Sequence, residues 1–118
     1  MQIKLFALLC LSSPAFAITP QADAEVKHLL SYVGHSTCEF LRNGEAYAAN
    51  DAKSHLEMKY QKTKDRLGSA DDFVNKVANG SSMTGRPYEI RCQGSKQLAA
   101  AWLNAELIKF RQKNEGKH

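Results

Sequence analysis

Residues 38–47 read Cys-Glu-Phe-Leu-Arg-Asn-Gly-Glu-Ala-Tyr, and this stretch decides how the chain folds. Asn43 and Gly44 lie between two short runs, and Asn-Gly is the dipeptide that best accommodates the two positive φ angles of a type I′ turn. The sequence therefore predicts a tight β-hairpin over residues 38–47.

A further strand is predicted at residues 88–92, Tyr-Glu-Ile-Arg-Cys, where polar and apolar residues alternate. We place Cys38 opposite Cys92 in an antiparallel pair with the first strand of the hairpin. This register matches apolar residues on one face of the sheet and opposite charges on the other face. The facing pairs are Phe40 with Ile90 and Glu39 with Arg91.

Residues 1–17 have the layout of a secretory signal peptide. Lys4 precedes an apolar run, and Ala15-Phe16-Ala17 supplies the small-x-small pattern at which signal peptidase cuts. We expect cleavage after Ala17. Lipid attachment at Cys10 is a weaker alternative, because the bulky Leu9 precedes it. No apolar run reaches the roughly 18 residues that a spanning helix needs, so no transmembrane segment is expected.

Cleavage would leave Cys38 and Cys92 as the two cysteines of the exported chain. An even number of cysteines in an oxidising compartment indicates an intramolecular disulfide. A zinc site is the alternative, but His35 and Cys38 have no second ligand pair nearby in the sequence. We therefore expect neither a metal nor a cofactor.

Four helices are predicted around these strands, near residues 20–34, 48–67, 69–79 and 96–113. Thr19 before Pro20 is a favourable start for the first helix. In the last helix an apolar stripe is expected from Leu98, Ala101, Trp102, Ala105 and Ile108. Residues 18–118 then form one α+β domain, with about four helices packed on a small antiparallel sheet.

The charge of the chain argues against nucleic acid as a partner. Of 118 residues, 16 are Lys or Arg and 12 are Asp or Glu, and the two signs are interspersed. Nucleic-acid binding requires a stronger and more clustered basic excess. Residues 59–66 and 109–113 are interpreted as solvated helix faces, and the second of these is expected to fray.

Four blocks of the sequence together resemble the YfeK-like family of small uncharacterised proteins predicted to be exported to the bacterial periplasm. The blocks are Phe40-x-Arg42-Asn43-Gly44, Ala52-x-x-His55-Leu56-x-x-Lys59, Phe73-x-x-Lys76-Val77-Ala78 and Ser81-Ser82-x-Thr84-Gly85-x-Pro87-Tyr88. The resemblance implies bacterial export and one compact domain, and it brings no activity, cofactor or catalytic residue. Because the family does not share cysteines at positions 38 and 92, the bridge is an inference from this sequence alone.

Two polar segments are candidates for ligand binding, and the disulfide register would bring them to one surface. The first is the turn at Arg42 and Asn43, where a guanidinium could hold a carboxylate or phosphate. The second is an irregular loop whose backbone amides could converge on an anion. Its candidate residues are Ser81, Ser82, Thr84, Gly85 and Arg86. In the competing interpretation the hydroxyls bond to the loop's own backbone, and Arg42 caps a helix or pairs with Glu45.

The leading hypothesis is a non-catalytic binding or interaction module of the bacterial periplasm that recognises an envelope protein or a small ligand. The alternative is a small hydrolase or transferase that uses Ser82 and His55, which would require the loop to fold over the helix that carries His55. No complete catalytic constellation supports that alternative. A third hypothesis is a structural or stress-resistance protein without a ligand.

Overall fold

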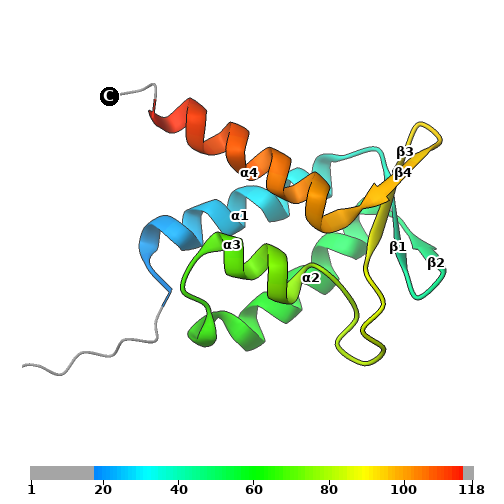
Figure 1. Cartoon of the computed structure of the whole chain (residues 1–118), viewed down its shortest axis with the longest axis horizontal. Coiled ribbons are helices and arrows are strands. Elements are labelled where there is room, and N and C mark those ends of the chain that lie inside the picture. Colours follow the sequence, from blue (N-terminus) through cyan, green and yellow to red (C-terminus); the bar gives the residue numbers. More distant parts are fainter. Residues whose placement is uncertain (1–17, 116–118) are drawn as a thin grey trace, which may run out of the picture.

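The computed structural model describes residues 18–115, and the expected signal peptide at residues 1–17 lies outside them. Figure 1 shows the helices gathered on one side of a small sheet. The elements are α1 (Pro20–His35), β1 (Glu39–Arg42), β2 (Glu45–Tyr47), α2 (Ala49–Thr63), α3 (Ala70–Asp72), β3 (Glu89–Cys92), β4 (Ser95–Leu98) and α4 (Ala99–Glu115). A 3-10 turn, η2 (Lys64–Arg66), follows α2, and a π-helical turn, η3 (Phe73–Val77), continues α3. The fold is α+β, as the sequence predicts.

The four strands pair in the order β2-β1-β3-β4, and each neighbouring pair is antiparallel. Strands β1 and β3 adopt the predicted register, with Phe40 opposite Ile90 and Glu39 opposite Arg91. Cys38 and Cys92 form the expected disulfide, and their Cα atoms lie 4.5 Å apart. The bridge joins the start of β1 to the end of β3, which are far apart in the sequence.

The turn between β1 and β2 has the predicted geometry, with φ of 51° at Asn43 and 85° at Gly44. A second turn has nearly the same geometry, with φ of 52° at Gln93 and 85° at Gly94. It joins β3 to β4, so residues 88–98 form another hairpin. The prediction of a helix from residue 96 was therefore wrong, because residues 95–98 pair with β3 as an edge strand.

The predicted apolar stripe of the last helix was also wrong. Helix α4 begins at Ala99, and its buried residues are Ala99, Leu103 and Leu107, which lie four residues apart. Leu98 and Ile108 are 50% and 55% exposed. Ala101 and Ala105 are also exposed, and Trp102 packs against the edge of the core. Contacts with α1, η3 and β3 determine which face of α4 is buried.

The core lies between the helices and one face of the sheet. Its largest fully buried side chains come from all four helical regions and from β3: Val26, Leu29, Val33, Tyr60, Phe73, Val74, Ile90, Leu103 and Leu107. Helix α1 is capped as predicted, since Thr19 Oγ1 accepts a hydrogen bond of 3.1 Å from the amide of Ala22. Ser69 caps α3 in the same way, through the amide of Asp72 at 3.1 Å.

The C-terminal end of α4 is held by an ion pair, contrary to the expected fraying. Arg111 donates to both carboxylate oxygens of Glu25 at 2.9 and 3.0 Å, and to Asp71 at 2.6 Å. Glu25 is 5% exposed. Such a buried carboxylate requires a cationic partner, so Arg111 ties α4 to α1 and α3.

Candidate functional site

The turn at residues 42–44 and the loop at residues 81–86 lie in contact, as the predicted disulfide register implies. Asn43 makes both hydrogen bonds between them: its Nδ2 donates to Ser81 Oγ at 3.4 Å, and its Oδ1 accepts from Thr84 Oγ1 at 2.7 Å. The Arg86 guanidinium lies about 4 Å from the position that a Cβ on Gly44 would occupy. The turn and the loop therefore form one polar surface, which we call the turn-loop surface.

Within the loop, hydroxyl groups bond to nearby backbone amides. Ser81 Oγ accepts from the amides of Met83 and Thr84 at 3.3 Å, and Thr84 Oγ1 accepts from the amide of Arg86 at 3.1 Å. Gly85 completes the turn with φ of 76°. Ser81 and Thr84 therefore shape the loop. Among the described residues, the side chains of Ser82 and Arg86 make no hydrogen bond and are exposed to solvent.

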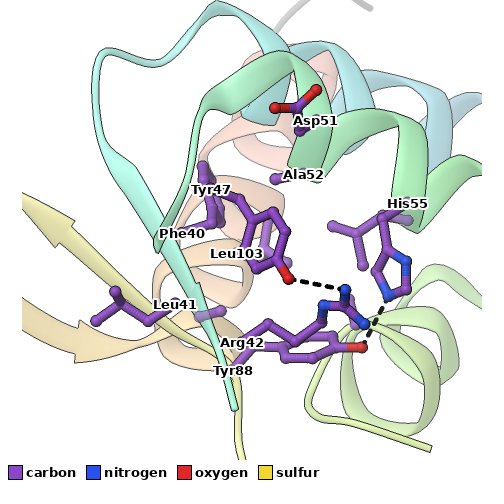
Figure 2. A pocket seen from close by; sticks show the side chains of 12 residues that line it. Phe40, Leu41, Arg42, Tyr47, Asp51, Ala52, His55, Tyr88 and Leu103 are labelled. Carbon is purple, nitrogen blue, oxygen red and sulfur yellow. Dashed lines mark hydrogen bonds between the residues drawn. The ribbon is translucent and has the colours of Figure 1, made fainter. Parts of the chain in front are cut away.

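A pocket of about 280 Å³ opens beside the turn-loop surface, between β1, α2 and the first turns of α4 (Figure 2). Its wall is mostly apolar, with lining residues Phe40, Leu41, Ala52, Leu56, Ala78, Ala99 and Leu103. Its polar lining residues are Arg42, Tyr47, Asp51, His55 and Tyr88. Figure 2 shows the Arg42, His55 and Tyr88 side chains close to one another, whereas Asp51 lies apart from them.

The hydroxyl of Tyr88, the residue just before β3, bonds to two side chains of α2 at this pocket. It accepts a hydrogen bond of 3.0 Å from Lys59 Nζ and lies 3.1 Å from His55 Nε2. Lys59 Nζ also donates to the carbonyl of Gly80 at 2.8 Å. Since the phenol has one proton, the simplest arrangement has Lys59 donating to Tyr88 and Tyr88 donating to a neutral His55. Lys59, expected on a solvated helix face, is therefore part of an internal network.

The pKa shifts agree with this arrangement. Burial, then Arg42 and then Lys59 lower the pKa of His55 from 6.5, so the ring is mainly neutral at pH 7. Burial and Arg42 lower the pKa of Lys59. Burial raises the pKa of Tyr88, and the positive charge of Arg42 opposes that effect. Arg42 thus acts on all three groups, which places a positive potential at this end of the pocket.

Arg42 is held by Tyr47. Its Nη2 donates to the Tyr47 hydroxyl at 3.0 Å, and its guanidinium carbon lies 4.9 Å from the centre of the Tyr47 ring. The Tyr47 hydroxyl donates to Glu45 at 2.9 Å. The Tyr47 hydroxyl therefore links Arg42 to Glu45 by two hydrogen bonds, and the predicted Arg42–Glu45 pair is indirect. Within residues 18–115, neither Arg42 nor Lys59 forms an ion pair with a carboxylate.

The pocket was not predicted from the sequence, although one pattern pointed toward it. Asp51, His55 and Lys59 recur every four residues and so lie along one face of α2. Tyr88 is contributed by the start of the β3 hairpin, and its partnership with that face depends on how the sheet packs. The spacing in the sequence could therefore indicate the shared helix face, but not that Tyr88 bonds to it.

His55 does not form the pair that the hydrolase alternative requires. Its ring bonds to Tyr88, and its other contact of note is edge-to-face with the Tyr88 ring, at 6.1 Å between centroids. Within the described part of the chain, no hydrogen bond joins His55 to Ser81 or Ser82. The contacts of His55 within the described residues therefore give no support to the hydrolase alternative.

Two other features bear on the kind of site. Across residues 18–115, no group of three or more His, Cys, Asp or Glu side chains could hold a metal ion. The helices of that same range include none with the length and apolarity to span a bilayer.

Comparison with known proteins gives a family without an assigned activity. Residues 20–111 match the model of DUF5329, a family of unknown function. The chain is 37% identical over 82 residues to the uncharacterised protein YfeK of Salmonella typhimurium, and the alignment covers 68% of each chain. No solved structure matches. The chain therefore belongs to the DUF5329 family and is similar to YfeK.

Proposed function

We propose that this chain is a non-catalytic binding domain, exported to the bacterial periplasm, that recognises an envelope component through its pocket and the adjoining turn-loop surface. Export is supported by the signal-peptide pattern of residues 1–17, which lie outside the described residues. The Cys38–Cys92 bridge is consistent with an oxidising compartment.

The observation that carries the proposal is the guanidinium of Arg42 at one end of an apolar pocket. Arg42 lines the pocket, and Lys59 bonds to the hydroxyl of the lining residue Tyr88. Within residues 18–115 no carboxylate forms an ion pair with either cation. A convergent polar cluster at an apolar pocket is the usual form of a ligand site. Tyr47 and Tyr88 hold these cations in place, so little ordering would accompany binding.

The turn-loop surface has two roles in this proposal. Ser81, Thr84 and Asn43 would maintain its shape, since their side chains are occupied by internal hydrogen bonds. The exposed Ser82 and Arg86 side chains would contact the partner. Met83, which is 94% exposed at the tip of the loop, would add an apolar contact.

The test is photo-cross-linking in intact bacteria that express the full chain. A photoreactive residue replaces Met83 on the loop, and a matched control replaces the exposed Ile108 on α4. We expect a discrete cross-linked product from position 83 that is absent from position 108 and weakened by Arg42→Gln. Equal products at both positions would refute the surface, and retention in the cytoplasm with residues 1–17 uncut would refute export.

A further inference from the structure

The pocket wall restricts the ligand to a small apolar group. Phe40, Leu56 and Leu103 provide bulky side chains, and Ala52, Ala78 and Ala99 leave the space open. The volume of about 280 Å³ is at the lower end of the range for small-molecule sites. One aromatic ring or a short branched chain fits such a space, whereas an oligosaccharide or a peptide of several residues does not.

The polar end of the pocket selects the charge of that ligand. Arg42 uses one of its five N–H donors on Tyr47, at 3.0 Å, and that is its one side-chain hydrogen bond within residues 18–115. The remaining donors can hold a carboxylate in the bidentate geometry that guanidinium favours. Lys59 adds a second positive charge beside Tyr88. One acid, Asp51, lines the pocket, but Figure 2 shows it apart from Arg42, and it forms no ion pair with that guanidinium. Glu45 is bonded to the Tyr47 hydroxyl and does not line the pocket.

We infer that the pocket binds a small monocarboxylate whose apolar or aromatic group fills the space along Leu56 and Leu103 while its carboxylate pairs with Arg42. A dianion such as phosphate is disfavoured, because most of the lining is apolar and burying a second charge there is costly. A cation is disfavoured at this end of the pocket by the guanidinium of Arg42. This inference deepens the proposed function and rests on it, in that both assign binding to this pocket.

The test measures binding of 3-phenylpropionate to the purified protein with its Cys38–Cys92 bridge formed, by amide chemical shifts in two-dimensional NMR. Matched probes are 3-phenylpropanamide and 3-phenylpropylamine, which share its shape, and acetate and inorganic phosphate, which lack its ring. We expect saturable shifts at pocket residues such as Ala52 and Ala99 with the carboxylate. The amide, which replaces the charged partner of Arg42, should bind at least about tenfold more weakly.

Two variants separate the parts of the site, and one serves as a control. Arg42→Gln should weaken 3-phenylpropionate about tenfold or more, because it removes the charged donor. Arg66→Gln makes the same change in net charge on the exposed turn η2, outside the pocket lining and the turn-loop surface, and should alter affinity by less than twofold. Ala52→Met fills the apolar space and should abolish ring-dependent binding. The amide spectrum of each variant establishes that it remains folded.

Several results would overturn the inference. One is the absence of saturable shifts with 3-phenylpropionate. Another is equal affinity for the amide, the amine, acetate or phosphate. A third is an equal loss of affinity in Arg42→Gln and Arg66→Gln. If those results occur while Arg42-dependent cross-linking from position 83 persists, the ligand class fails and the binding domain stands. If the probe binds as expected but the chain stays in the cytoplasm without a cross-linked partner, the ligand class stands and the proposed function fails.

Discussion

Replacing both Cys38 and Cys92 with Ser should remove a large part of the stability of the fold. The two cysteines are 54 residues apart in the sequence. In the chain-entropy model, a closed loop of that length restricts the unfolded chain by about 4 kcal/mol. Both side chains are only partly buried where they meet the core, so the hydroxyls should add little further cost.

We therefore expect the free energy of unfolding to fall by about 3–4 kcal/mol. A domain of this size commonly has about 5–15 kcal/mol in total, so the variant should remain folded with a much reduced margin. The melting temperature should fall by roughly 15–25 °C. The dependence of the unfolding free energy on urea should steepen, because the unfolded chain expands without the bridge.

The assay is urea denaturation followed by far-ultraviolet circular dichroism, on purified protein with the Cys38–Cys92 bridge formed. Wild type treated with a phosphine reductant should unfold like the double serine variant, and the variant itself should not respond to the reductant. A loss below about 1 kcal/mol in both cases would refute the idea that the bridge constrains the unfolded chain.

Three further outcomes test other parts of the structure. Arg111→Leu leaves the buried Glu25 carboxylate without its cationic partner and should cost about 3–5 kcal/mol in urea unfolding, with partial recovery on adding Glu25→Gln; a loss no larger than that of an exposed residue would contradict the buried pair. NMR titration of His55 should give a pKa below 6.5 that rises in Arg42→Gln, and a pKa above 6.5 would contradict the network. Because the unfolded ring then binds its proton at higher pH than the folded ring, the contribution of His55 to stability should be lost as the pH falls below about 6.5. Gln93→Asn should raise the melting temperature, with a gain of up to about 1 kcal/mol, since Asn enters the left-handed region more readily than Gln; destabilisation would argue against the second hairpin turn.

Local chemistry was sufficient to predict the features that depend on neighbouring residues. Asn43-Gly44 specified the first turn because both positions require positive φ, and both have it. Thr19 and Pro20 specified the start of α1 for a similar reason, the capping of free amides. The register of β1 and β3 was also accessible, since one alignment satisfied the cysteines, the apolar residues and the charges together.

The second hairpin could not be predicted because local preferences oppose it. Gln93 is an uncommon residue at positive φ, and the alanines after Leu98 favour a helix that would extend backwards through residues 96–98. Pairing with β3 outweighs that preference. This choice also shifts the start of α4 to Ala99 and hence determines which of its residues are buried.

The amino-acid sequence by itself determined the fold class, the first turn, the main strand register and the disulfide, because each depends on short-range backbone preferences or on one consistent pairing. Only the tertiary structure decided that Arg111 holds Glu25, and that Arg42, His55 and Tyr88 line one pocket. These residues come from separate elements, and a side chain's partner and degree of burial exist only once those elements have packed. For the same physical reason the turn and the loop could be predicted as candidates, whereas the pocket beside them could not.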